Sequence, residues 1–92
     1  MYKRLEGHKY SQCEVYIDEK QNITFISYVT NVIYAIKNKN GLYNITCTGT
    51  YSATTRKQIG YFLSEYFPSL NYYDIKAIAY TDKVIKDVER SF

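Results

Sequence analysis

The feature that most constrains this chain is a helical pattern of apolar residues that ends at a proline. Four residues form the pattern: Ile59, Phe62, Leu63 and Tyr66. Positions i, i+3, i+4 and i+7 share one face of an α-helix, so these side chains make an apolar stripe that must pack against another element. Pro68 pushes the residue before it out of the α region. The sequence therefore predicts a helix over residues 55–67.

The start of this helix has several candidate caps. Thr55 and Gln58, three residues apart, match a capping box, in which each side chain bonds a backbone N–H of the other residue. Ser52 and Thr54 are alternative N-caps, because a hydroxyl just before a helix can accept a bond from an unpaired N–H of the first turn.

Strand patterns precede the helix. Four β-rich segments are predicted to pair as an antiparallel meander: residues 12–18, 23–29, 32–37 and 42–48. The first alternates apolar and polar side chains, which is the period of a half-buried strand. Thr30-Asn31 is a weak break between the second and third segments. Asn40-Gly41 is a strong hairpin signal, because both residues accept the positive φ that tight turns need.

The last hairpin predicts which strand residues face inward. A two-residue loop at Asn40-Gly41 pairs Ile36 with Ile45 and Tyr34 with Cys47 on an apolar face, and a four-residue loop keeps the same parity. Polar residues then occupy the other face. Five strand residues are expected in the core: Val15, Ile17, Ile26, Ile36 and Ile45.

The remaining chain favours a second helix. Residues 72–80 are predicted to be a short helix, although the alternation of residues 75–81 also fits a strand, and residues 81–92 fit either state. Strands followed by helices indicate an α+β fold, with a four-stranded antiparallel meander packed against both helices. A length of 92 residues suits a single domain spanning 1–92.

The chain offers little material for catalysis. His8 is the single histidine, and the two cysteines, Cys13 and Cys47, lie in predicted strands where they read as small core residues. No glycine-rich phosphate loop and no tetrahedral set of metal ligands is recognisable in the sequence. We predict that the protein is not an enzyme and uses no cofactor or metal. With no apolar run near the N-terminus and none long enough for a bilayer, we expect a cytoplasmic protein without a membrane partner.

Charge is unevenly distributed along the chain. No aspartate or glutamate occurs from Lys20 to Ser64, and this stretch holds five cations: Lys20, Lys37, Lys39, Arg56 and Lys57. A basic surface with aromatic residues nearby is typical of nucleic-acid binding, and it also suits an acidic protein partner. The third interpretation is an ordinary solvated face.

Arg56 and Lys57 lie in the first turn of the predicted helix, and Glu65 in its last turn. Both placements oppose the helix dipole, at a cost of roughly 0.3–1 kcal/mol each. Cations placed against the helix dipole indicate either an anion-contacting patch or ion pairs with acidic residues of the first strand segment. We predict a partner-binding surface that combines the helix start with the Lys37–Asn40 turn. Its residues are Thr54, Arg56, Lys57, Lys37, Lys39 and Tyr61.

Gly60 lies inside the predicted helix, where glycine is unfavourable by about 1 kcal/mol relative to alanine. It is either simply tolerated or it allows the close approach of another backbone, from a second protomer or a partner. The sequence therefore leaves open whether the protein forms a homodimer.

Residues 51–63 (Tyr-Ser-Ala-Thr-Thr-Arg-Lys-Gln-Ile-Gly-Tyr-Phe-Leu) resemble a recurrent pattern in small uncharacterised proteins of phages and mobile elements of Gram-positive bacteria. In that pattern Tyr-Ser-x-Thr-Thr leads into a helix with a following Ile and Phe-Leu, and a histidine often stands at the place of Gln58. The resemblance implies a non-enzymatic phage accessory protein. Such proteins often bind and block host machinery, anti-CRISPR proteins included.

The resemblance and the charge pattern together predict the partner class. We expect a host protein or ribonucleoprotein in the host cytoplasm, such as a CRISPR effector, that this protein binds and blocks. The alternative is a small basic protein that binds nucleic acid directly.

Overall fold

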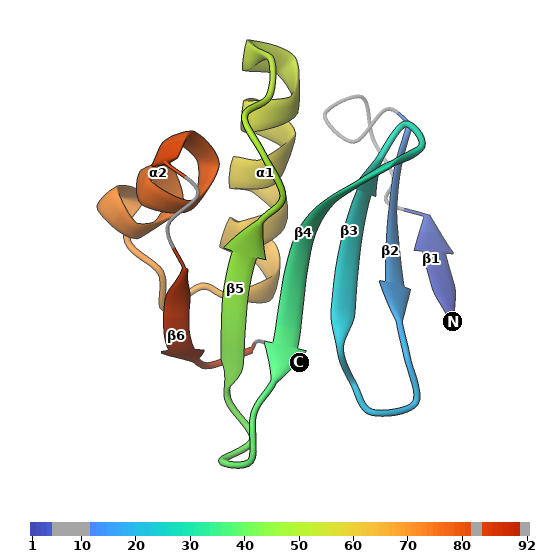
Figure 1. Ribbon diagram of the computed structural model, residues 1–92, viewed down its shortest axis with the longest axis vertical. Coiled ribbons are helices and arrows are strands. Elements are labelled where there is room, and N and C mark those ends of the chain that lie inside the picture. The colour runs from blue at the N-terminus through green and yellow to red at the C-terminus, as the bar shows by residue number, and fades with distance from the viewer. Residues whose placement is uncertain (5–11, 82–83, 91–92) are drawn as a thin grey trace.

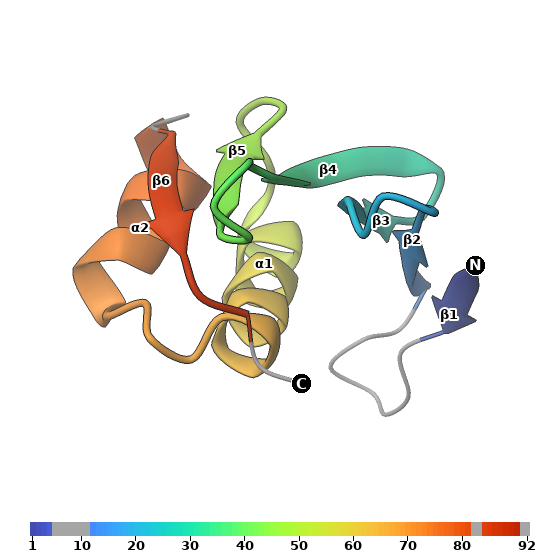
Figure 2. The ribbon, with the colours of Figure 1, turned by 90° about the horizontal axis from the view of Figure 1, so that it is seen from below.

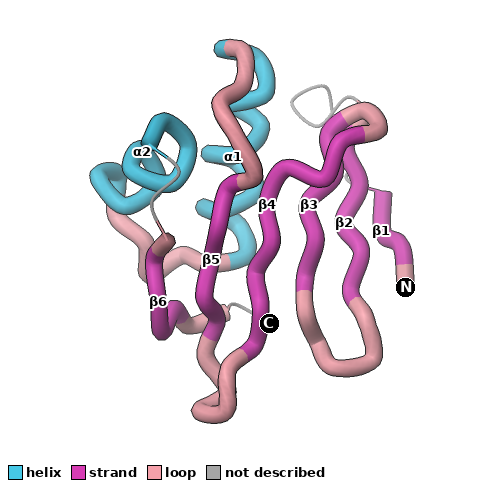
Figure 3. Tube along the Cα trace, viewed as in Figure 1, coloured by secondary structure: helices cyan, strands magenta, loops and turns pink. Residues whose placement is uncertain are grey.

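The computed structural model describes residues 1–4, 12–81 and 84–90 of the chain. In chain order, these residues form the following strands and helices, which Figure 1 labels: β1 (Tyr2–Arg4), β2 (Cys13–Ile17), β3 (Ile23–Ser27), β4 (Thr30–Lys37), β5 (Tyr43–Cys47), α1 (Ala53–Tyr66), α2 (Tyr72–Thr81) and β6 (Ile85–Val88). Every neighbouring pair of strands is antiparallel, and the strands follow one another across the sheet in sequence order. Figure 3 traces this alternation of strands and turns.

Both helices lie on the same face of the sheet, as Figure 2 shows from the end of the molecule. The predicted α+β class, with an antiparallel sheet and two helices, is confirmed. Within the part of the chain that the structure describes, the sheet has six strands, whereas the sequence predicted four, because short β1 and β6 extend its two edges. The sequence left open whether residues 81–92 are helical or extended, and part of this segment forms strand β6. The single histidine, His8, lies outside the described residues.

Strand β6 was hard to foresee because it depends on distant partners. Its residues Ile85 and Val88 pair with β5, and the register shifts between these two pairs. Asp87 takes a positive φ of 58° inside this irregularity. The Asn38 side chain donates to Asp87 Oδ1 at 2.8 Å, and Asp87 N donates to Asn44 Oδ1 at 3.2 Å. Side-chain bonds thus supplement the backbone ladder that holds this edge strand.

The turn between β3 and β4 lies two residues earlier than predicted. Ser27 pairs with Thr30, so Tyr28 and Val29 form the hairpin tip, and Thr30-Asn31 belongs to β4. Tyr28 has a φ of 58°, a conformation in which turn-forming glycine or asparagine is the usual choice. A break predicted from residue type alone therefore missed the turn.

The predicted inward face of β4 was wrong. Lys37 pairs with Tyr43, and Asn38 N donates to Leu42 O at 2.7 Å, so the tip of this turn has three residues, 39–41, with Gly41 at φ 79°. A loop with an odd number of residues shifts the register by one and reverses which side chains face the core. Tyr34 is consequently 36% exposed and Ile36 46% exposed, and both lie on the outer face of the sheet.

A bulge in β4 completes this change of register. Phe25 pairs with Ile33 and Ile26 with Asn31, which leaves Val32 as the extra residue. Val32 and Ile33 are both fully buried. Strict alternation over β4 therefore breaks down. On β3, Phe25 takes the inward place that the sequence assigned to Ile26, because it pairs with the buried Val15 of β2, and Ile26 is half-buried.

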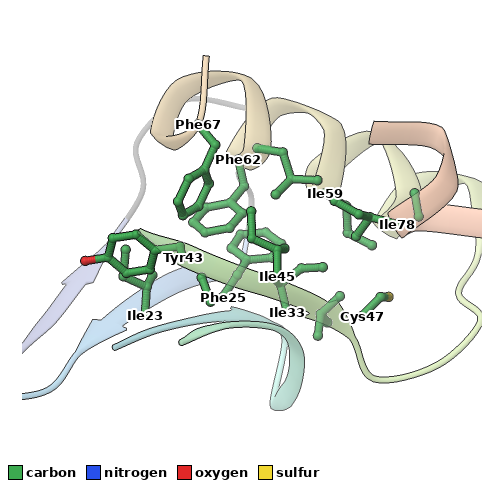
Figure 4. Close-up of a cluster of buried hydrophobic side chains, with 14 of the residues drawn as sticks. Ile23, Phe25, Ile33, Tyr43, Ile45, Cys47, Ile59, Phe62, Phe67 and Ile78 are labelled. Carbon is green, nitrogen blue, oxygen red and sulfur yellow. The ribbon is translucent and has the colours of Figure 1, made fainter. Parts of the chain in front are cut away.

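The core lies between the sheet and α1, as Figure 4 shows in close-up. Val15 and Ile45 are fully buried as predicted, and Ile17 is partly buried against the core. The rings of Phe25 on β3 and Phe62 on α1 stack with their centroids 4.6 Å apart. This aromatic contact joins the predicted helical stripe to the centre of the sheet.

The predicted helices are both confirmed, with small changes at their ends. Ser52, one of the alternatives, is the N-cap of α1, and its Oγ accepts a bond from Thr55 N at 3.4 Å. Gln58 is not part of a capping box. It is buried, and its side-chain carbonyl accepts a 2.7 Å bond from the Ser27 hydroxyl. Phe67 is the C-cap just before the proline.

Candidate functional site

A groove of about 320 Å³ lies between α1 and α2. Eight residues line it: Ala53, Arg56, Lys57, Tyr72, Ile75, Lys76, Ala79 and Tyr80. The three charged residues among them are all cations. Because all eight lie on the two helices, the way these helices pack creates the site.

Helical spacing brings the groove residues into two facing rows. On α2, Tyr72, Lys76 and Tyr80 recur every fourth residue, so they share one face of that helix. On α1, Arg56 and Lys57 follow Ala53 by three and four residues and share a face in the same way. Each row is local in sequence, and the fold places the rows side by side.

Arg56 links the two helices. Its Nη1 donates to Tyr51 O at 3.1 Å, and its Cζ lies 4.4 Å from the ring centroid of Tyr80 on α2. These contacts with Tyr51 and Tyr80, rather than ion pairs with the acidic residues of the first predicted strand, offset its unfavourable place in the first turn of α1. Its Nε is buried and has no hydrogen-bond partner among the described residues.

Lys76, on the same helix as Tyr80, also lies near that tyrosine. Its Nζ lies 4.7 Å from the ring centroid of Tyr72 and 5.8 Å from that of Tyr80. A hydrogen bond with the Tyr72 side chain raises the pKa of Lys76 above its ordinary value. Tyr80 therefore has two cations, Arg56 and Lys76, beside one ring. Cations held this close repel one another, and a bound anion would relieve that repulsion.

The structure divides the predicted partner-binding residues into two groups. Arg56 and Lys57 line the groove, and Thr54 is exposed in the same helical turn. Lys37 and Lys39 are exposed near the β4–β5 turn, whereas α1 begins beyond the other end of β5. The five residues of β5 alone separate the two places by about 17 Å, and Figure 1 shows the turn and the helix start at opposite ends of the molecule. One contiguous surface does not contain both groups.

Tyr61, the remaining predicted residue, is 41% exposed on α1 and is not part of the groove lining. Sequence reasoning missed Tyr72, Lys76 and Tyr80. Their spacing of four residues was a usable signal, since it places a lysine between two tyrosines on one face of the predicted second helix.

Other chemistry-bearing residues lie outside the groove. Cys13 and Cys47 are buried, and burial raises the pKa of the Cys13 thiol, which disfavours its reactive thiolate form. Within the described residues, His, Cys, Asp and Glu side chains form no group of three or more that could hold a metal ion.

No protein-family model matches the chain, and neither a curated protein nor a solved structure is significantly similar to it. Among the described residues, no helix has the combination of length and apolar character that crossing a membrane requires. The phage-protein resemblance of residues 51–63 therefore remains a prediction.

Proposed function

We propose that this protein is a non-catalytic binding module that docks on an anionic surface of a host macromolecule and blocks it. The observation that carries the proposal is the groove between α1 and α2, whose charged residues are Arg56, Lys57 and Lys76. Positive charge gathered on one concave surface favours acidic partners and speeds encounter with them.

The chemistry of the groove supports binding over catalysis. Arginine stays protonated at physiological pH, and the raised pKa of Lys76 makes its amine a poorer general base. The tyrosine rings contribute flat apolar surface with a hydroxyl at one end, a side chain that is common in binding interfaces. Such a set of groups recognises a partner without needing to transform it.

The target class follows from the resemblance of residues 51–63 to phage-encoded proteins. We propose a host ribonucleoprotein, with CRISPR effectors as the first to test, because the RNA of such a complex presents dense negative charge. Direct blocking of such a complex requires only that the groove occupy a surface that the complex uses.

Purified CRISPR effector complexes, mixed with this protein and run on a sizing column, test the proposal. The expected result is co-elution of the wild-type protein with at least one effector and inhibition of its cleavage of target. The double variant Lys57→Glu, Lys76→Glu should lose both, since these exposed cations line the groove. Arg56 stays unchanged in it because its contacts join the helices.

The matched control is Lys37→Glu, Lys39→Glu, which changes the net charge by the same amount at the opposite end of the molecule. It should bind like the wild-type protein. Retention by no effector in a representative panel would overturn the proposal. Equal losses in the two double variants would also overturn it, since the groove would then have no special role.

A further inference from the structure

We infer that the groove between α1 and α2 binds single-stranded nucleic acid, with phosphates against its three cations and a base stacked on a tyrosine ring. The inference rests on the proposed function, because it names the chemistry of the anionic surface that the groove contacts. It applies equally to a free strand and to an exposed strand within a ribonucleoprotein.

The charge of the groove matches a phosphodiester backbone. Arg56, Lys57 and Lys76 come from two helices and converge on one surface, and every charged residue in its lining is basic. Arg56 and Lys76 both lie within 6 Å of the Tyr80 ring centroid, at 4.4 and 5.8 Å. A backbone with one charge per nucleotide can meet several such cations in succession, which a compact single anion cannot do.

The rings of the groove distinguish a nucleic acid from an acidic peptide. Tyr72 is 63% exposed and Tyr80 is 51% exposed, although each ring also contacts a cation. Exposed aromatic rings next to cations are the elements that bind unpaired bases, because every base has a flat face for stacking. A peptide carboxylate would engage the cations and leave the ring faces unused.

The position of these rings favours a single strand over a duplex. Bases are stacked inside a duplex, and a protein reaches their faces only where the strand is unpaired. Tyr72 and Lys76 lie one helical turn apart, a rise of about 6 Å along α2. A base on Tyr72 would therefore place its own phosphate within reach of Lys76.

Fluorescence anisotropy with the full chain tests this inference. The probes are a labelled single-stranded RNA of mixed sequence, its DNA counterpart, the matching RNA and DNA duplexes, and a poly-glutamate peptide. Single strands should bind most tightly. Three phosphate contacts predict a slope of about −2 for log affinity against log salt, or a loss of about 20-fold between about 50 and 200 mM salt.

Variants separate the two components of the site. Lys57→Gln should reduce that salt-dependent loss to about sevenfold, because one phosphate contact of three disappears. Tyr72→Leu should weaken binding by about 5- to 150-fold with the salt slope unchanged, since stacking is not electrostatic. The controls are Lys39→Gln, away from the groove, and Tyr34→Leu, an exposed tyrosine on the outer sheet face. Both should match the wild-type protein, and circular dichroism confirms that each variant is folded.

The outcomes distinguish this inference from the proposed function. Absence of single-strand binding at about 50 mM salt, or equal affinity for duplexes or poly-glutamate, overturns the inference. The inference also fails if Lys39→Gln lowers the salt dependence as much as Lys57→Gln does, or if Tyr34→Leu weakens binding as much as Tyr72→Leu does. If an effector complex retains the protein but no strand binds, the blocking function stands and the inference fails. If single strands bind and no effector is retained, the inference stands and the blocking function fails.

Discussion

Gly60 shows how a residue that weakens a helix can reflect the packing around it. It faces α2, where Ile75 Cγ2 would lie 4.0 Å from a Cβ added to the glycine. The close neighbour at this position is therefore a second helix of the same chain. A distance of 4.0 Å is ordinary van der Waals contact, so α1 has room for a methyl group here.

We expect Gly60→Ala to increase the free energy of unfolding by about 0.5–1 kcal/mol, because alanine loses less backbone entropy in a helix. Urea denaturation followed by circular dichroism measures the change. Gly41→Ala is the contrasting variant and should destabilise, since Gly41 has a φ of 79°. A less stable Gly60→Ala protein would mean that the two helices pack more tightly than the structure shows.

Ser27 and Gln58 form a buried polar pair between β3 and α1. Their side chains are 3% and 4% exposed, and the Ser27 hydroxyl donates to Gln58 Oε1 at 2.7 Å. Gln58→Leu leaves that hydroxyl without this acceptor, so we expect a loss of about 1–3 kcal/mol in unfolding free energy. Adding Ser27→Ala to Gln58→Leu should recover part of the loss. Strict additivity of the two single changes in a double-mutant cycle would show that the pair is not coupled.

At the scale of single elements, β4 and β5 differ most from expectation. Their pairing was predicted correctly, but an odd loop and a bulge set the register. The sequence placed two isoleucines opposite each other in the core, but they lie on opposite faces of the sheet: Ile45 is fully buried and Ile36 is 46% exposed.

Alanine substitution of these two isoleucines tests the register. Ile45→Ala should cost about 2–5 kcal/mol, the range for removing a fully buried aliphatic side chain. Ile36→Ala should cost less than about 1 kcal/mol, because half of its side chain is already in water. Chemical denaturation of the two variants gives both numbers. Losses of similar, large size in the two variants would instead support the register that the sequence predicted, in which both isoleucines face the core.

The turn between β2 and β3 depends on one carboxylate. Asp18 accepts bonds from Asn22 N and Lys20 N, both at 2.9 Å, and from Asn22 Nδ2 at 3.2 Å. The bond from Asn22 N is the main cause that lowers the pKa of Asp18 below its ordinary value. The charged form is therefore favoured in the folded protein. Its contribution to stability is present above the ordinary pKa and disappears as the pH falls through the lowered one.

We expect the thermal midpoint of the wild-type protein to fall more steeply from about pH 5 to about pH 2.5 than that of Asp18→Asn. The asparagine keeps an acceptor and removes the titrating group. Glu19→Gln, which removes a carboxylate from the next residue, is the control and should keep the steep wild-type dependence. Parallel curves for the wild-type protein and Asp18→Asn would show that this turn contributes nothing to the pH dependence.

At the scale of the whole molecule, the sheet has a protected centre and two short edges. The edge strands β1 and β6 have three and four residues, while α1 packs on the centre of the sheet. One cluster of buried apolar residues connects strands β2 to β6 with both helices. At the edges, β6 contributes Val88 to this cluster, with Ile85 partly buried against it, whereas Tyr2 on β1 is 67% exposed.

Amide hydrogen exchange should reflect this arrangement. We expect the slowest exchange in the central strands, at Phe25, Ile33 and Ile45, and faster exchange in β6 at Ile85. Central amides open only with the core, whereas an edge strand can detach by itself. Protection of β6 equal to that of β4 would show that the edge opens only together with the core.

The sequence by itself determined the elements whose signals are local. The 3.6-residue stripe and Pro68 define α1, and Asn71 and Asp74 bond each other's backbone N–H groups at the start of α2. Period-two alternation and Asn40-Gly41 identified the strands and one of their turns. These signals depend on neighbours within a few residues, so they act in any fold that the chain adopts.

Only the tertiary structure decided the inward face of β4, the existence of β6 and the candidate site. The β4 face depends on whether a loop is odd or even, and β6 depends on pairing with a strand about forty residues away. The groove needs the Arg56 row of α1 to meet the Lys76 row of α2. Each row was readable as a helical face, but their contact is set by how the two helices pack, which no local pattern specifies.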